Sequence, residues 1–110
     1  MEKLQFLVQG SAEKPYEVTF QRDSNNLSAY CSCPAGENGQ YCKHRVNILS
    51  GIKDGIVSNN EPDVKVVTSW LPGSDLEKAL HVFKRAEEQF EMAEQELSSA
   101  KKRFARALRD

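Results

Sequence analysis

No stretch of this 110-residue sequence approaches the roughly 20 consecutive apolar residues that a membrane-spanning helix needs. The first residues, MEKLQFLVQGS, also lack the extended apolar segment of a secretory signal peptide. Cysteine is scarce, and the 3 cysteines present cannot all pair with one another in disulfides because their number is odd. We therefore expect a cytoplasmic protein, because a reducing compartment keeps thiols free for metal binding.

An excess of charge of either sign is also missing. The sequence has 15 Lys and Arg residues against 16 Asp and Glu residues, for a formal net charge of −1. Such a balance gives no overall basic field of the kind that drives non-specific binding to nucleic acid. The sequence also contains no phosphate-binding loop and no carboxylate–histidine constellation, so we expect that the protein is not an enzyme.

The most informative feature present is a compact group of metal-ligand residues in the segment CSCPAGENGQYCKH. Cys31 and Cys33 form one pair, and Cys42 and His44 form a second pair after 8 intervening residues. Those intervening residues include proline, glycine and asparagine, which allow a tight turn that brings the two pairs to opposite sides of one ion. Three thiolates and one imidazole suit tetrahedral Zn²⁺ in a closed site, so we predict one structural zinc ion per chain.

Other interpretations of these four residues are weaker. A disulfide between Cys31 and Cys33 is disfavoured, because cysteines this close in sequence do not easily reach disulfide geometry. Buried, inert thiols remain an alternative, since free cysteine is often a core residue. A catalytic cysteine–histidine pair also remains open on composition alone. Neither alternative explains why four ligand-type residues gather around a segment rich in turn-forming residues.

The same segment resembles the SWIM-type zinc finger, whose pattern is Cys-x-Cys, a variable gap and Cys-x-His. The flanking sequence is similar too. An alternating segment, YEVTF, precedes the ligands, Pro34 follows the second ligand, and an apolar run, HRVNIL, follows the last. The resemblance extends over about residues 15–52. It implies a compact β-β-α unit around one zinc ion, of a kind that occurs in proteins that bind nucleic acid or other proteins.

Apolar and alternating segments before the ligands predict a small β-meander. Residues 4–9 are apolar and strand-like, and residues 16–21 alternate strictly between apolar and polar side chains. Polar residues at 23–26 indicate a turn. A short strand over residues 27–30 then leads into the first two ligands. The last strand of the meander is therefore expected to position Cys31.

The sequence pattern becomes helical from about residue 41. Val46, Leu49 and Ile52 recur at helical spacing, and Gly51 marks the expected end of this helix. The second ligand pair would lie at the helix start, where the helix dipole favours a thiolate.

The segment that follows the finger is less regular. Residues 53–61 are typical of a loop. Residues 62–71 allow two interpretations: Val64, Val67 and Trp70 fit one face of a helix, whereas the β-branched content favours a strand. We predict a short helix there, with Trp70 as a buried core residue.

Residues 74–109 predict one long helix, because they contain no glycine or proline and begin with a capping-box pair, Ser74 and Glu77. Large apolar residues and alanines recur along this segment at heptad spacing. This narrow stripe predicts a coiled-coil seam with another chain, and the alternative is a helix that lies on its own domain. The a positions are Leu76, Phe83, Phe90, Leu97 and Phe104, and the d positions are Ala79, Ala86, Ala93, Ala100 and Ala107.

Charge along this helix indicates how two copies would pair. Most of the charged residues in 75–96 are acidic, whereas residues 101–109 carry only basic ones. Two antiparallel copies would place each basic segment beside an acidic one, so we expect an antiparallel homodimer with its two-fold axis near Phe90. The basic segment has a second possible use as a contact for nucleic acid. His81 falls at the outermost heptad position and is expected to be exposed and not to bind metal.

Together these features predict an α+β protein in three parts. They are β-strands with the zinc finger over 1–53, a connector over 54–73 and a long heptad-patterned helix over 74–110. We expect a zinc-binding, non-catalytic module for dimerisation and protein interaction, with a protein partner. The alternative is a zinc-dependent accessory protein that binds nucleic acid. Its candidate contacts are Arg22, Lys43 and Arg45.

Overall fold

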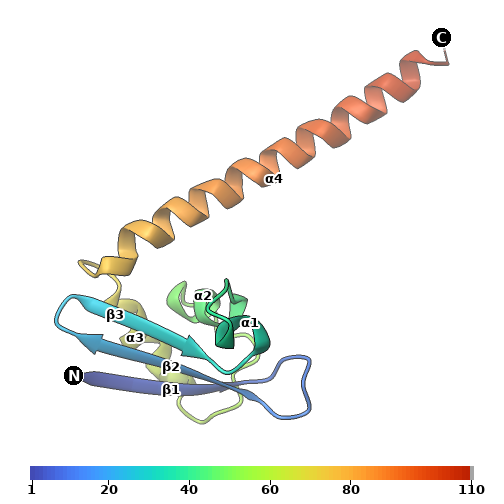
Figure 1. The fold of residues 1–110 in the computed structure, drawn as a ribbon. Coiled ribbons are helices and arrows are strands. Elements are labelled where there is room, and N and C mark those ends of the chain that lie inside the picture. The colour runs from blue at the N-terminus through green and yellow to red at the C-terminus, as the bar shows by residue number, and fades with distance from the viewer. Residues whose placement is uncertain (110) are drawn as a thin grey trace. The chain divides into compact units, whose positions relative to one another are not determined.

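The structure of the protein is a computed structural model that describes residues 1–109 (Figure 1). A three-stranded sheet comes first, followed by short helices and one long helix, which confirms the predicted α+β class. The chain divides into two compact units, of which the first is Met1–Glu77 and the second begins at Lys78. The elements in order are β1 (Glu2–Val8), β2 (Tyr16–Asp23), β3 (Asn26–Cys31), α1 (Pro34–Glu37), α2 (Lys43–Leu49), η1 (Glu61–Asp63), α3 (Val64–Trp70) and α4 (Asp75–Ala107).

The sheet is antiparallel with the strand order β1-β2-β3, as a meander requires. In the register, Val18 of β2 pairs with Phe6 of β1 on one side and with Cys31 of β3 on the other. Directly paired residues share one face of a sheet, so these three side chains point to the same side. Phe6, Val18 and Phe20 are fully buried there, and the two phenylalanine rings meet edge to face at 6.0 Å. The register therefore places the first predicted ligand on the core face.

The outer edge of β1 is closed by residues of the segment predicted to be a loop, 53–61. The backbone N–H of Gln9 donates to the carbonyl oxygen of Gly55 at 2.8 Å, and the N–H of Val57 donates to that of Leu7 at 2.8 Å. These bonds add a short antiparallel bridge beside β1. The edge of the sheet is thereby protected from pairing with another chain.

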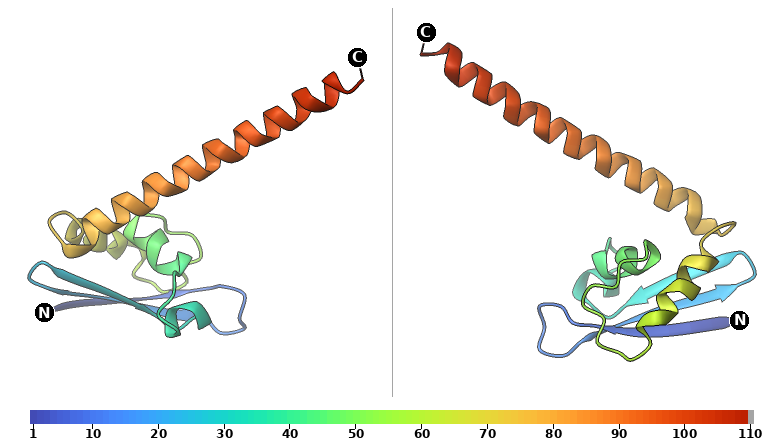
Figure 2. Two further views of the ribbon diagram at one scale, coloured as in Figure 1. Left: turned by 45° about the horizontal axis from the view of Figure 1, so that its top comes forward. Right: turned by 180° about the vertical axis from the view of Figure 1, so that it is seen from behind.

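Helices α2 and α3 cover the core face of the sheet (Figure 2). Ile48 of α2 is buried, as are Val64, Val67 and Trp70 of α3. These three α3 side chains recur every three residues and therefore lie on one side of a helix, which decides between the helix and strand interpretations of residues 62–71. The predicted short helix is confirmed, and Trp70, only 5% exposed, belongs to the core.

Gly51 ends α2 in the way that the sequence predicts. Its φ angle is 85°, a conformation in which a side chain would be strained. The N–H of Gly51 donates to the carbonyl oxygen of Ile48 at 3.0 Å, and the N–H of Ile52 donates to that of Asn47 at 2.8 Å. This pair of bonds is a Schellman end. The apolar spacing predicts that Ile52 belongs to the helix face, but Ile52 lies beyond the helix and is 39% exposed.

The long helix α4 comprises 33 residues, in agreement with the predicted helix. At its start, the Ser74 hydroxyl accepts a hydrogen bond from the N–H of Leu76, and the Glu77 carboxylate accepts one from the N–H of Gly73. Glu77 thus reaches one residue further back than a standard capping box, in which it would meet Ser74. His81 is exposed, as expected. None of the described helices is both long and apolar enough to cross a membrane.

Asp75 links the start of α4 to the hairpin between β2 and β3. Its carboxylate Oδ1 accepts a hydrogen bond from the N–H of Leu27 at 2.8 Å, and its own N–H donates to the carbonyl oxygen of Asn25 at 3.0 Å. Leu27 is only 2% exposed, so water has little access to the N–H that Asp75 satisfies.

Replacement of Asp75 by alanine should therefore destabilise the zinc-loaded protein. We expect Asp75→Ala to lower the free energy of unfolding by about 1–2 kcal/mol, because the N–H of Leu27 loses a charged acceptor. Urea unfolding followed by far-UV circular dichroism measures this loss. The matched control is Asp54→Ala, which removes a carboxylate from an exposed turn and should cost less than about 0.5 kcal/mol. Equal losses in the two variants would contradict the assigned role of Asp75.

Candidate metal centre

Three different elements bring the four predicted ligands together. Cys31 is the last residue of β3, and Cys33 is the N-cap residue of α1. Cys42 is the N-cap residue of α2, and His44 lies in the first turn of that helix. Their ligand atoms all lie within 4.8 Å of one another. Residues separated by up to 13 positions in the sequence thus meet at one point, as the motif spacing predicts.

The distances between ligand atoms match those around one tetrahedral ion. The Sγ atoms of Cys33 and Cys42 are 3.4 Å apart. Nδ1 of His44 is 3.7 Å from Sγ of Cys31 and 3.4 Å from Sγ of Cys42. Ordinary zinc bond lengths would separate two sulfurs by about 3.8 Å and a sulfur from a nitrogen by about 3.6 Å. One zinc ion therefore fits this Cys₃His donor set after only small movements of the side chains.

The eight residues between the ligand pairs contain a short helix that the sequence pattern did not reveal. The proline, glycine and asparagine residues of this segment predict a turn, but Pro34–Glu37 forms α1. Pro34 occupies the first helical turn, where its missing N–H costs nothing. The N–H of Gly36 donates to Sγ of Cys33 at 3.3 Å. A hydrogen bond of this kind stabilises negative charge on a ligand sulfur.

Gly36 also packs closely against β3. A Cβ atom at this position would lie 2.5 Å from the carbonyl oxygen of Cys31 and 2.8 Å from its Cβ atom. Both atoms belong to the end of a strand and cannot move away easily. The absence of a side chain at Gly36 therefore allows α1 to lie against the strand that carries the first ligand.

The three thiols are buried, and the pKa values of Cys31 and Cys42 are shifted in opposite directions. Each cysteine is 4–5% exposed. Burial raises the pKa of the Cys31 thiol to about 12. Burial also opposes ionisation of Cys42, but hydrogen bonds from the Arg45 backbone N–H and from the neighbouring ligand side chains lower its pKa to about 6. Cys42, at the start of α2, thus ionises more readily than Cys31 and is the readier of the two to bind a cation as a thiolate.

His44 is held between the sulfurs and an aromatic ring. Its Nδ1 atom faces the thiols, while its ring packs at a tilt against Tyr16, with the ring centres 5.1 Å apart. On that side lies Gly10, where a Cβ atom would come within 2.6 Å of the Tyr16 ring and 3.3 Å of Nε2 of His44. The chain leaving β1 therefore passes close to the imidazole, and a side chain at position 10 would require the Tyr16 ring to shift.

Arg45 fixes the ligand-bearing helix to the sheet. Its guanidinium donates to the carbonyl oxygen of Ala29 in β3 at 3.3 Å and to that of Gln40, just before the second ligand pair. The sequence indicated neither this role nor the roles of Gly10, Gly36 and the Tyr16 ring. Each depends on a contact between segments that are separated along the chain, and no local pattern marks such contacts.

A small antiparallel sheet, short helices and a buried Cys₃His cluster define the class of the first unit as a zinc finger. Residues 6–49 match the family model described as the SWIM zinc finger. This match confirms the resemblance seen in the ligand spacing, and it supports a unit that could bind one structural zinc ion. It also includes the last three residues of β1, which the predicted range of 15–52 left out. Comparisons with curated proteins and with solved structures found no match.

Removal of one ligand tests the metal centre directly. We expect Cys33→Ser to lower zinc affinity by about a hundredfold or more and to unfold the finger, because metal binding and folding are coupled in small zinc units. Zinc content by mass spectrometry and secondary structure by circular dichroism measure the two effects. His81→Ala removes a ligand-type residue outside the cluster and should change neither. A Cys33→Ser protein with full zinc content and native stability would overturn the assignment of this ligand.

Substitution of Gly36 tests the packing of α1 on β3. Gly36→Ala should weaken zinc binding about tenfold, because the added Cβ would push Cys33 away from the other ligands. The matched control is Gly39→Ala, at a glycine with a φ of 69° and nothing within 4 Å of an added Cβ. That control should cost about 1 kcal/mol of stability and leave zinc affinity unchanged. Competition with a chromogenic chelator measures both affinities, and equal values for the two variants would refute the packing argument.

Proposed function

We propose that the protein is a non-catalytic interaction module, in which a zinc-stabilised finger is joined to a helix that self-associates. The observation that carries this proposal is an exposed apolar row on α4. Phe90, Leu97 and Phe104 occupy successive a positions and are 65%, 56% and 65% exposed. Monomeric proteins rarely expose contiguous large apolar side chains, because water disfavours them.

The alanines of α4 complement this row. Every d position from Ala79 to Ala107 is alanine, so a second helix backbone can approach closely between the large side chains. Helices with this arrangement bury phenylalanine and leucine of one chain against the alanines of another. A second copy of the same chain provides both halves of such a seam, which makes a homodimer the simplest partner.

The finger itself supports a structural and not a catalytic role. Zinc bound by three thiolates and one imidazole has four protein ligands, which leaves no open position for substrate or water. The thiol ligands also favour a reducing location such as the cytoplasm. The finger would then present a rigid surface to a protein partner, while α4 sets the number of copies.

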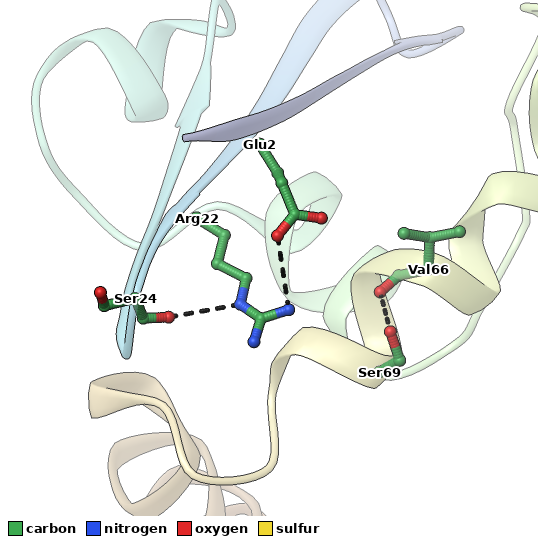
Figure 3. Close-up of polar contacts among 5 residues, drawn as sticks. All are labelled: Glu2, Arg22, Ser24, Val66 and Ser69. Carbon is green, nitrogen blue, oxygen red and sulfur yellow. Dashed lines mark hydrogen bonds and ion pairs between the residues drawn. The ribbon is translucent and has the colours of Figure 1, made fainter.

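A nucleic-acid partner is the second candidate, and the basic side chains bear on it. Arg22 forms an ion pair with Glu2 at 3.6 Å and donates to the carbonyl oxygen of Ser24 (Figure 3). The Arg45 guanidinium donates to two backbone carbonyl oxygens. Of the three basic residues suggested for phosphate contacts, two are thus engaged within the fold and Lys43 is exposed. These contacts favour the protein partner, and salt-sensitive DNA binding by the purified protein would favour the alternative.

A substitution in the proposed seam tests self-association. We expect wild-type protein to be dimeric in analytical ultracentrifugation and Ala93→Leu to weaken the dimer at least about tenfold, because a larger side chain keeps the helices apart. The control is Ala105→Leu, the same substitution at a b position of the same helix, away from the seam. Unchanged association in Ala93→Leu, or equal weakening in both variants, would contradict the seam.

A further inference from the structure

The exposed apolar row indicates which part of α4 a partner covers. This inference rests on the proposed self-association and specifies its geometry. Of the five a residues, Leu76 and Phe83 are only partly exposed, whereas the three beyond them are 56–65% exposed. The exposed part of the row is therefore centred on Leu97, one heptad beyond the expected position of the two-fold axis near Phe90.

The sizes of the seam residues set the direction of the second helix. In a parallel pair, a positions face a positions and d positions face d positions. Layers of two phenylalanines would then alternate with layers of two alanines, which leaves some layers overfilled and others empty. In an antiparallel pair each a residue faces a d residue, so every layer holds one large and one small side chain. Only the antiparallel arrangement fills all layers evenly.

We propose that two copies of α4 bind each other antiparallel, with the two-fold axis between Ser98 and Ser99. Positions that face each other across this axis then have residue numbers whose sum is close to 197. The three exposed large residues are all covered in this register. The layers are Phe90 with Ala107 of the partner subunit, Leu97 with Ala100 of the partner subunit, and Phe104 with Ala93 of the partner subunit, each repeated by the symmetry.

The charges beside the seam select this register. In an antiparallel pair, e positions face e positions of the partner and g positions face g positions. Glu94 and Lys101 are e residues that face each other across the proposed axis, and Glu96 and Arg103 are g residues that do the same. Because the two-fold axis repeats both contacts, the dimer has four opposite-charge pairs. The same register brings no two like charges together at these positions.

Other arrangements of the same helices lack this complementarity. With the axis moved one heptad toward Phe90, to lie between residues 91 and 92, Glu87 faces Glu94 of the partner subunit twice and no opposite charges meet. With the axis at residue 95, Glu94 and Glu96 each face their own copy in the partner, and these two repulsive contacts offset the two contacts between Glu87 and Lys101 of the partner subunit. A parallel, in-register pair keeps only the contact between Glu96 and Lys101 of the partner subunit, on each side. Like charges that face each other are destabilising, which disfavours the two shifted antiparallel registers. The parallel pair has no like charges in contact, but it has two opposite-charge contacts where the proposed register has four.

Glu96 and Arg103 give a sharp test, because a charge swap distinguishes the registers. Glu96 has no charged residue three or four positions away on its own helix, so its reversal acts mainly on the partner. We expect Glu96→Arg alone and Arg103→Glu alone to weaken the zinc-loaded dimer about tenfold each, because two attractive pairs become repulsive. The double variant restores the attraction and should return to within about threefold of the wild-type dissociation constant. Sedimentation equilibrium at 50 mM salt measures all four proteins.

The control variants distinguish an error in the proposed register from an error in the proposed self-association. Glu88→Arg combined with Arg109→Glu makes the same exchange at outermost f positions and should leave the dimer unchanged. A double Glu96→Arg, Arg103→Glu variant that is no tighter than the single variants would overturn the proposed axis while self-association stands. Rescue of Glu96→Lys by Lys101→Glu, and not by Arg103→Glu, would show a parallel pair and also overturn it. A wild-type protein that is monomeric at all concentrations would instead refute the proposed function.

Discussion

Four ligand atoms from separate elements must meet within one coordination sphere, and the first unit of the protein is built around that requirement. The register of the sheet places Cys31, the start of α1 places Cys33, and the start of α2 places the remaining pair. A zinc ion bound to these atoms would therefore cross-link a strand and two helices that are each too short to be stable alone. A small unit with a core of few side chains gains from such a cross-link what a larger core would otherwise supply.

Close backbone packing makes the metal centre a closed one. Gly36 lets α1 lie directly on the end of β3, and Gly10 lets the chain after β1 pass beside the imidazole of His44. The three ligand sulfurs are buried, and the Tyr16 ring packs against the imidazole of His44, which is half-buried. A low-polarity, fully ligated environment is suited to holding a fold together and unsuited to activating water, which is why the centre favours a structural role.

The long helix α4 is stabilised by other interactions than the zinc finger is. The helix α4 contains no buried residue, and its order comes from helix propensity, an acidic start and the absence of glycine and proline. Its apolar side chains are periodic and exposed, so they are available for burial against a partner. The zinc finger is stabilised by its own core and metal ligands. The proposed seam on α4, in contrast, becomes buried only when a second chain is present.

Features that depend on short-range patterns were predictable from the sequence. Alternation identified β2, ligand spacing identified the four metal ligands, and heptad spacing identified the long helix, because each pattern directly reflects the periodicity of a local structure. Residues 62–71 were a borderline case, in which β-branched side chains favoured a strand but burial against the sheet selected a helix.

Only the tertiary structure decided the remainder. The carboxylate of Asp75 satisfies an N–H group 48 positions away, and Gly36 and Gly10 matter because other segments pass within contact distance of them. The short helix α1 was hidden among turn-forming residues and is stabilised by its bond to a ligand sulfur. Composition and periodicity predict the secondary structure of a single segment and which of its faces is apolar. They carry no information about which distant backbone atom approaches a given residue, and that approach is what closes the metal centre.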